Sequence, residues 1–232
     1  MSYQEFRPGR FNQIPLVVKN ILIINVILYA ANMLFSNVLP LDKYLDLYFF
    51  KSHYFKPHQF ITYMFMHSKT DPTHIIFNML AVYMFGSILE NLWGSKRFLN
   101  FYILCGLGAA AAQYAVDFYH YREIINSVGG TLSPEMDSQL KYYYDGGGTL
   151  GASGAVFGLL AAFAMMFPNT YLYLYFAIPI KAKYFVLGYA VIEFFSGSFG
   201  LEPGVAHFAH LGGAAVGAII VLIWRRNRSN FY

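Results

Sequence analysis

The sequence has 232 residues, of which 57% are hydrophobic and only 12% are charged, and its mean hydropathy is +0.42. A soluble domain carries about 25% charged residues, so this composition excludes a soluble protein and indicates an integral membrane protein. The formal charge of +4 does not indicate a nucleic-acid partner, because the basic residues lie between apolar runs and do not gather on one polar face. The single cysteine, Cys105, lies in an apolar run and excludes a disulfide framework.

Six apolar segments are predicted to cross the membrane as helices. They span residues 16–35, 72–93, 98–119, 152–167, 184–195 (the core of the fifth span) and 206–224. A bilayer of about 30 Å needs about 20 apolar residues. The first run is long and has no convincing small-residue cleavage site, so it is interpreted as a retained span and not a signal peptide. The predicted fold is an all-α six-transmembrane-helix bundle forming one domain over residues 1–232, with an N-terminal segment 1–15, a core 16–225 and a tail 226–232.

The connections between the spans differ in character. Residues 37–58 are rich in aromatic side chains and are predicted to lie partly in the membrane interface, and residues 60–67 resemble a short helix. Asp71 is a good N-cap for the second span, and Pro72 fits its first helical position. The other connections are predicted as a tight basic turn, a long polar segment, a loop with alternating Tyr and Leu, and a Gly/Ser/Pro loop, at residues 94–97, 120–147, 168–183 and 196–205.

The basic residues predict the orientation of the chain in the membrane. Six spans place both termini on one side, and short cytoplasmic loops carry an excess of Lys and Arg. One side would hold Arg7, Arg10, Lys19, Lys96, Arg97, Lys181, Lys183, Arg225, Arg226 and Arg228, and the other Lys43, Lys51, Lys56, Lys69, Arg122 and Lys141. The first set is larger and its loops are shorter, so both termini are predicted to be cytoplasmic.

The second, fourth and sixth spans would all begin on the outer side, and each carries polar residues near that end. His74 and Asn78 lie four residues apart, and so on one face of the second span. Ser153 begins the fourth span, and His207 and His210 lie near the start of the sixth. Polar groups inside a membrane are costly and usually mark function, so these side chains are candidates for one shared site.

Ser153 lies where a glycine-rich run, residues 146–158, enters an apolar helix. Free N–H groups and the positive end of the helix dipole favour a developing oxyanion there. The flanking Gly151 and Gly154 let backbone and substrate approach closely. A serine nucleophile needs a base, and histidine is the natural base near neutral pH. No buried aspartate lies near either candidate histidine in the sequence, so a Ser–His dyad is predicted and not a triad.

These residues resemble the motifs of the rhomboid family of intramembrane serine proteases. The family pattern of His-x-x-x-Asn, Gly-x-Ser-x and Ala-His-x-x-Gly on the second, fourth and sixth helices reads here as His74-Ile-Ile-Phe-Asn78, Gly151-Ala-Ser-Gly154 and Ala209-His-Leu-Gly-Gly213, and Glu90-Asn-Leu-Trp-Gly94 resembles the family's end of helix two. The resemblance covers all six spans in order. It implies that Ser153 is the nucleophile, that His210 is the general base, and that Phe157, often tyrosine in the family, stacks on that histidine. It also implies an oxyanion site made of His74, Asn78, Gly151 and the N–H of Ser153.

Two histidines of the sixth span, His207 and His210, each follow an alanine. Only His210 is followed by Leu-Gly-Gly and by a Gly213-x-x-x-Gly217 pair, whose small residues would let the sixth helix approach the fourth at Gly154 and Gly158. His207, one turn nearer the outer surface, is predicted to be solvated or to act in gating. His67 is predicted to be structural and to hydrogen-bond the first outer loop. His53, His58 and His120 are predicted to be interfacial and are assigned no role. The acidic residues Glu90, Asp117 and Glu193 are predicted to be buried or interfacial hydrogen-bond partners and not catalysts.

The predicted function is therefore an intramembrane serine endopeptidase that cleaves transmembrane segments of other membrane proteins in the lipid bilayer, with no cofactor and no metal. A bacterial plasma membrane is the expected location. The dyad must open to water on the outer side, and the fifth span with the 196–205 loop is a candidate gate.

Three alternatives remain. The first is a catalytically silent relative that binds transmembrane helices. The second is a metal or haem protein using His74, His207 and His210, which is disfavoured because no His-Glu-x-x-His pattern occurs. The third is a transporter, which is disfavoured because no paired broken helices are indicated.

Overall fold

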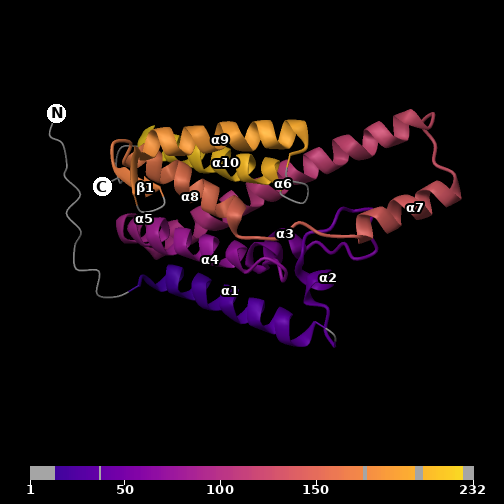
Figure 1. Ribbon diagram of the computed structural model, residues 1–232, viewed down its shortest axis with the longest axis horizontal. Helices are drawn as coiled ribbons and strands as arrows, with labels where there is room; N and C mark the ends of the chain where they lie inside the picture. Colours follow the sequence, from indigo (N-terminus) through magenta and orange to yellow (C-terminus); the bar gives the residue numbers. More distant parts are fainter. Residues whose placement is uncertain (1–13, 37, 175–176, 202–205, 227–232) are drawn as a thin grey trace.

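The computed structural model describes residues 14–36, 38–174, 177–201 and 206–226. It is a helical bundle from which a helical hairpin projects at one end (Figure 1). The helical segments that match the six predicted spans are α1 (Leu16–Phe35), α4 (Pro72–Ala81) with a π turn (Val82–Gly86) and α5 (Ser87–Trp93), α6 (Ser95–Ser127), α8 (Ser153–Met166), α9 (Ala182–Phe199) and α10 (His207–Arg226). Four of the described helices are long and apolar enough to cross a membrane, namely α1, the continuous 72–93 segment, α6 and α10. The predicted all-helical membrane fold is confirmed.

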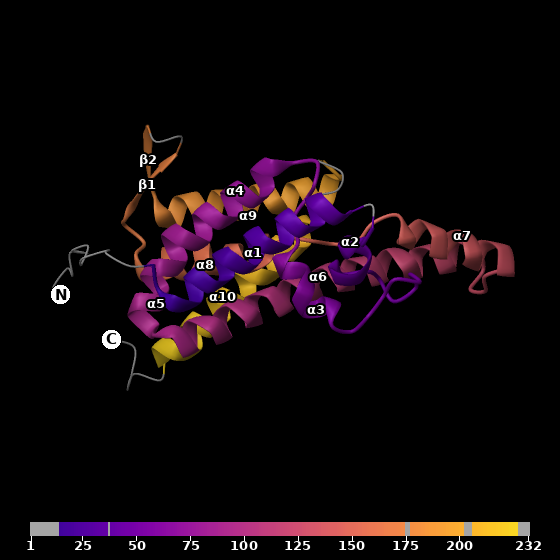
Figure 2. The same ribbon diagram turned by 90° about the horizontal axis from the view of Figure 1, so that it is seen from below.

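The ends of the helices have the parity that the sequence predicts. In Figures 1 and 2, α1 begins and α10 ends at the same end of the bundle, and α7 (Pro134–Asp145) lies at the opposite end. The helices α4, α8 and α10 therefore all begin toward the α7 end. The described residues do not include residues 1–13 of the predicted N-terminal segment or residues 227–232 of the predicted tail. The basic residues Arg7, Arg10 and Arg228 therefore lie outside them, as do residues 202–205 of the last loop.

The interpretation of residues 120–147 as a polar loop is wrong, because most of them are helical. Helix α6 has 33 residues, which at 1.5 Å per residue is roughly 50 Å, longer than a bilayer of about 30 Å. Its last turns therefore extend beyond the apolar layer. Ser133 then caps α7 by accepting a hydrogen bond from the N–H of Met136 at 3.2 Å, and Pro134 occupies the first helical position.

Two other connections are more regular than predicted. Gly94, at φ +79°, separates α5 from α6, so Lys96 and Arg97 belong to the first turn of a helix and not to a loop. Residues 168–183 contain an antiparallel hairpin of β1 (Tyr171–Leu174) and β2 (Ile178–Lys181). The alternating Tyr and Leu of this segment have the two-residue period of a strand.

Small residues bring α10 into contact with α6 and α8. A Cβ atom added to Gly217 would lie 2.8 Å from the carbonyl oxygen of Gly158, and one added to Gly213 would overlap the backbone of Gly154. On α6, Gly108 faces the backbone of Gly212 in the same way. The predicted close approach of the sixth helix to the fourth is confirmed. Such contacts stabilise helix pairs in lipid, where burial of apolar surface gives no net driving force.

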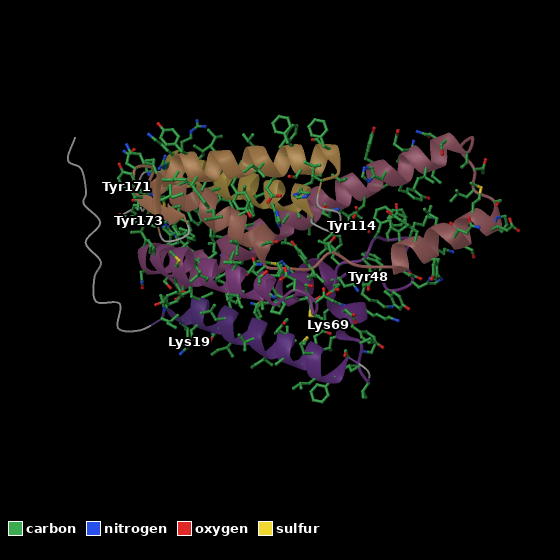
Figure 3. All side chains as sticks on the ribbon, in the orientation of Figure 1. Lys19, Tyr48, Lys69, Tyr114, Tyr171 and Tyr173 are labelled. Carbon is green, nitrogen blue, oxygen red and sulfur yellow. The ribbon has the colours of Figure 1, made fainter. Side chains whose placement is uncertain are left out.

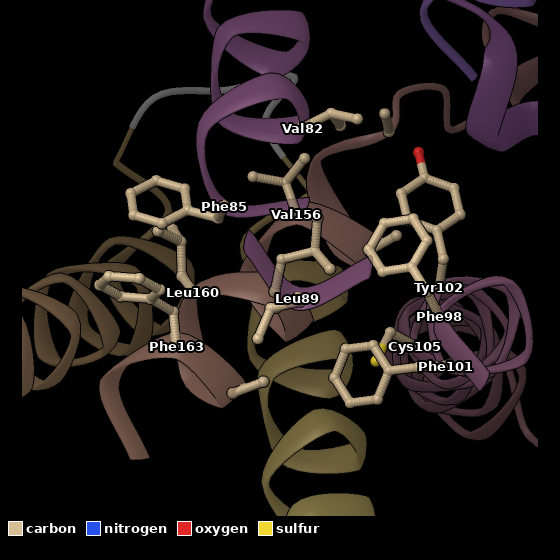
Figure 4. Close-up of a cluster of buried hydrophobic side chains, with 14 of the residues drawn as sticks. Val82, Phe85, Leu89, Phe98, Phe101, Tyr102, Cys105, Val156, Leu160 and Phe163 are labelled. Atoms are coloured by element: carbon tan, nitrogen blue, oxygen red, sulfur yellow. The ribbon is translucent and has the colours of Figure 1, made fainter. Parts of the chain in front are cut away.

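The apolar core lies where α5, α6 and α8 meet (Figure 4). Leu89 of α5, Phe98 of α6 and Leu159 of α8 are fully buried. The ring of Phe85 packs edge-on against Phe163 with the centroids 5.0 Å apart. This packing fixes the position of α8, whose first residue is Ser153.

Glu90 holds the start of α1 against this core. Its carboxylate accepts hydrogen bonds from the N–H groups of Val17 and Val18 at 2.9 and 2.8 Å, and from the hydroxyl of Ser95 at 2.6 Å. The side chain is 3% exposed. A buried carboxylate at a helix N-terminus accepts hydrogen bonds from the free N–H groups there and interacts favourably with the positive end of the helix dipole. The predicted role of Glu90 as a buried hydrogen-bond partner is confirmed.

The loop between α1 and α4, residues 38–71, is the one predicted to be the first outer loop, and it is ordered around Gln59. It contains α2 (Leu41–Leu45), and it leads into α3 (Gln59–Thr62) and a 3₁₀ turn (Tyr63–Phe65). The buried amide of Gln59 accepts from the N–H of Lys56 at 3.0 Å and donates to the carbonyl of Tyr54 at 2.9 Å. The prediction of a short helical piece before the second span is confirmed.

Asp145, at the end of α7, ties the projecting hairpin to this loop. Its carboxylate accepts from the hydroxyl of Ser52 at 2.7 Å and from the N–H of His53 at 2.9 Å. Burial would raise the pKa of Asp145, but the hydrogen bonds from Ser52 and His53 outweigh it and hold that pKa below its ordinary value. The hairpin is therefore anchored directly before the glycine-rich loop that leads to Ser153.

Candidate active site

The glycine-rich loop before α8 is held by backbone hydrogen bonds on both sides. Thr149 pairs with Leu47 of the outer loop through two bonds of 2.9 Å, and the N–H of Gly151 donates to the carbonyl of Tyr63 at 2.9 Å. Gly151 has φ +125°, and a Cβ atom there would lie 3.0 Å from Nε2 of His74. Only glycine suits both this backbone conformation and this contact. The loop thus brings Ser153 and His74 to the same point.

Ser153 and His210 form a hydrogen-bonded pair. The hydroxyl of Ser153 lies 2.7 Å from Nε2 of His210, within the range expected for a nucleophile and its base. The ring of Phe157, one turn along α8, stacks on the His210 ring with an interplanar angle of 3° and the centroids 4.5 Å apart. The structure therefore brings together the three residues that the sequence singled out on the fourth and sixth spans.

His74 and Asn78 lie one turn apart on α4, and the His74 ring contacts the glycine-rich loop at Gly151. The N–H of Ser68 donates to Nδ1 of His74 at 3.5 Å, so in the neutral ring the proton lies on Nε2, the nitrogen that faces Gly151. The amide of Asn78 donates one hydrogen to the carbonyl of His74 at 2.7 Å. Both side chains retain an N–H that could serve a developing oxyanion. Gly151 does not supply its own N–H, because that group is bound to Tyr63, and so it contributes space and backbone shape.

The prediction that His207 is solvated is wrong. This side chain is 6% exposed, because α9 packs over the start of α10 and supplies it with partners. Its Nδ1 lies 2.7 Å from the carboxylate of Glu193 on α9, and its Nε2 lies 3.0 Å from the carbonyl of Leu201.

The same oxygen of Glu193 also lies 3.0 Å from Nδ1 of His210. A third polar group therefore accompanies the predicted Ser–His pair. Glu193 was predicted as a buried hydrogen-bond partner, which is confirmed, but its proximity to His210 was not predicted.

The remaining histidines lie outside the Ser153–His210 pair. His67 is 1% exposed, and burial lowers its pKa to about 3, so its ring is neutral. Among the described residues, the predicted hydrogen bond from His67 to the outer loop is not seen; its ring instead packs against His74 with the centroids 5.1 Å apart. His53 and His58 contact Asp145 and the carbonyl of Tyr44 near the outer loop.

The water-filled opening expected at the dyad stays a prediction. A cavity of about 470 Å³ lies elsewhere, between the outer loop and the hairpin of α6 and α7, lined in part by Lys51, Tyr121 and Asp137.

Known proteins resemble this chain over most of its length. The family described as "Rhomboid domain" matches residues 54–227. The chain is 30% identical over 168 residues to "Rhomboid protease AarA" of Providencia stuartii, covering 69% of this chain and 53% of that protein. It is 32% identical over 179 residues to "RHOMBOID-like protein 12, mitochondrial" of Arabidopsis thaliana, covering 75% of this chain and 48% of that protein. It is 27% identical over 147 residues to "Rhomboid protein 1, mitochondrial" of Saccharomyces cerevisiae, covering 63% of this chain and 36% of that protein. The matched parts thus span about half or less of these relatives.

Proposed function

This chain belongs to the rhomboid family, and on that basis we propose that it is an intramembrane serine endopeptidase that cleaves transmembrane segments of other membrane proteins. The observation that carries the proposal is the 2.7 Å contact between the hydroxyl of Ser153 and Nε2 of His210, with Phe157 stacked behind the ring. A pair used only for packing would not need a nucleophile at a helix N-terminus facing a base.

The proposed reaction balances with these groups and water. Oγ of Ser153 attacks the carbonyl carbon of a peptide bond, its proton moves to Nε2 of His210, and the π electrons of the carbonyl move onto oxygen. The N–H groups of His74, Asn78 and Ser153 stabilise that oxyanion. The C–N bond then breaks, and the imidazolium gives its proton to the leaving amine. Water repeats both steps on the acyl-enzyme, which releases a carboxylate and restores the serine.

The membrane setting restricts the substrate. A transmembrane helix has its backbone hydrogen bonds satisfied, so it must unwind before a peptide bond can reach Ser153. We therefore expect small or helix-destabilising residues near the cleaved bond. The chain is an integral membrane protein, and we propose that both termini are cytoplasmic. The expected bacterial plasma membrane gains no support from the relatives, because two of the three described above are named as mitochondrial.

A serine-reactive fluorophosphonate tests the proposal on the full chain in detergent. Wild-type protein should be labelled and should cleave a transmembrane substrate, while Ser153→Ala and His210→Ala should do neither. His207→Ala should retain both at a reduced rate, because the His207 ring contacts Glu193 and Leu201 and not the serine. Thermal melts establish which variants are folded.

Three results would count against this proposal. Labelling of a folded His210→Ala variant, with none in a folded His207→Ala variant, would overturn the base assignment. A folded wild-type protein that binds a transmembrane peptide but is neither labelled nor active would support the silent helix-binding alternative. Stoichiometric metal in purified protein would favour the metal alternative.

A further inference from the structure

Glu193 is a buried carboxylate shared by two histidines. It lies on α9 and is 4% exposed, and its Oε2 atom lies 2.7 Å from Nδ1 of His207 and 3.0 Å from Nδ1 of His210. The contact with His207 is a well-aligned hydrogen bond, whereas the contact with His210 is close but poorly aligned. A carboxylate inside a membrane protein is costly, so its position beside the dyad needs an explanation.

The hydrogen bond between Ser153 and His210 determines which nitrogen of the His210 ring carries the proton that faces Glu193. Nε2 of His210 faces the serine hydroxyl at 2.7 Å and must accept its proton. The neutral ring must then carry its own proton on Nδ1, which is the nitrogen that faces Glu193. Because an ionised carboxylate only accepts, it favours this tautomer over the one that would block Nε2. It also stabilises the positive ring that forms when the serine loses its proton.

The surrounding residues hold Glu193 in this position. His207 binds the carboxylate through one ring nitrogen and the carbonyl of Leu201, just beyond α9, through the other. Gly197 lies one turn after Glu193 on α9, and a Cβ atom there would lie 2.9 Å from the ring of Phe208 and 3.0 Å from Cβ of His207. The missing side chain lets α9 approach α10 closely enough for the carboxylate to reach both rings.

We propose that Glu193 is a positioning residue for this reaction, which holds the His210 ring with its proton on Nδ1 and stabilises the imidazolium that forms during catalysis. His207 acts in turn by orienting the carboxylate. The active arrangement is therefore Ser153, His210 and Glu193, drawn from α8, α10 and α9. This inference rests on the proposed proteolytic function.

Glu193→Gln tests the proposal, because it keeps the size of the side chain and its ability to accept a hydrogen bond but removes the charge. The matched control is Glu90→Gln, which changes an equally buried carboxylate that binds α1 and Ser95. The measurements are kcat and KM on a transmembrane substrate, normalised to the protein that a fluorophosphonate labels at completion, together with the labelling rate and the melting temperature.

We expect Glu193→Gln to lower kcat per labelled enzyme and the labelling rate together by roughly 10- to 100-fold, because the negative charge 3.0 Å from Nδ1 of His210, which stabilises the imidazolium, is lost. KM should change by less than about threefold, because Glu193 touches no substrate. Glu90→Gln should lower the melting temperature and leave kcat per labelled enzyme unchanged. An unchanged kcat per labelled enzyme in Glu193→Gln would overturn the proposal, and a wild-type protein that is never labelled would instead overturn the proposed function.

A second pair of variants keeps the test decisive if Glu193→Gln does not fold. Glu193→Asp and Glu193→Asn have side chains of equal length and differ in charge. The aspartate variant should exceed the asparagine variant in kcat by about tenfold or more, since only the former can stabilise the imidazolium. Equal values of kcat in this pair would show that the position serves packing alone.

Discussion

At the scale of single residues, the proposed oxyanion site depends on the side-chain amide of Asn78, which already donates one of its two hydrogens to a carbonyl of its own helix. The amide of Asn78 donates to the carbonyl of His74 at 2.7 Å, which leaves its second hydrogen for another acceptor. On α1, Asn25 makes the same kind of bond to the carbonyl of Ile21, also at 2.7 Å. Asn25 is buried and belongs to no part of the site. It is therefore a matched reference for the structural role of such a bond.

We predict that Asn78→Ala lowers kcat by about 10²–10³-fold, the usual loss for one oxyanion donor. Some activity should remain, because His74 and the N–H of Ser153 still face the oxyanion. Asn25→Ala removes an equivalent bond and should lower the melting temperature without changing kcat per folded enzyme. Cleavage rates and thermal melts of the two variants measure this. Equal kcat in Asn78→Ala and wild type would remove Asn78 from the mechanism.

The positions of Ser153 and His210 could be predicted from the sequence because each lies beside glycines on an apolar helix, and helix parity places both at one depth. The contact of Glu193 with His210 could not be predicted. Glu193 lies on a different helix, 14 residues before His207, and which α9 side chains face α10 depends on the packing angle of the two helices. The same packing buries His207, which the sequence places near the outer water.

At the scale of helices and loops, hydropathy predicted the spans because apolar length is what the bilayer selects. It did not predict α7, whose sequence is polar, although Ser133 and Pro134 are a recognisable cap. It also did not predict that the outer loop pairs with the serine loop. That pairing joins Leu47 to Thr149 through two backbone bonds of 2.9 Å and places Cβ of the buried Asp46 against Gly148.

Asp46 makes this junction sensitive to pH. Burial, followed by the nearby charge of Asp42, raises the pKa of Asp46 to about 8, and one carboxyl oxygen has no hydrogen-bond partner. The folded state therefore keeps a proton that the unfolded chain loses near its ordinary pKa of 3.8. The unfolded state binds fewer protons between these values, so this group lowers stability as pH rises from about 4 to about 8.

We predict that Asp46→Asn removes this loss, because asparagine stays neutral throughout. Its melting temperature should exceed that of wild type by a margin that grows from pH 5 to pH 8 and then stays constant. Asp137→Asn is the control, since the pKa of Asp137 is lowered by its bonds to Lys141 and Lys51 and lies below this window. The melting temperature of Asp137→Asn should fall with pH as steeply as that of wild type. Parallel curves for wild type and Asp46→Asn would refute the buried-acid explanation.

At the scale of the whole molecule, charged and aromatic residues lie at both ends of an apolar bundle. Figure 3 shows Tyr171 and Tyr173 at the end where α1 begins, and Tyr48 and Tyr114 toward the end where α7 projects. Tyrosines favour both membrane interfaces, so they mark the two edges of the apolar layer without distinguishing them. The direction of insertion then depends on Lys and Arg. The first turn of α6 carries Lys96 and Arg97 at the end predicted to face the cytoplasm.

This orientation can be tested with new cysteines, because the single native thiol, Cys105, is fully buried in the core and should give no background. We predict that Thr131→Cys, in the exposed turn between α6 and α7, reacts with a membrane-impermeant maleimide in intact cells. Ile178→Cys, on the exposed hairpin between α8 and α9, should react only after the membrane is permeabilised. Neither substitution changes a charge, so the Lys and Arg distribution that sets the orientation is preserved. The reverse labelling pattern would place Ser153 nearer the cytoplasmic side, and its substrates would then have to be cut from that side.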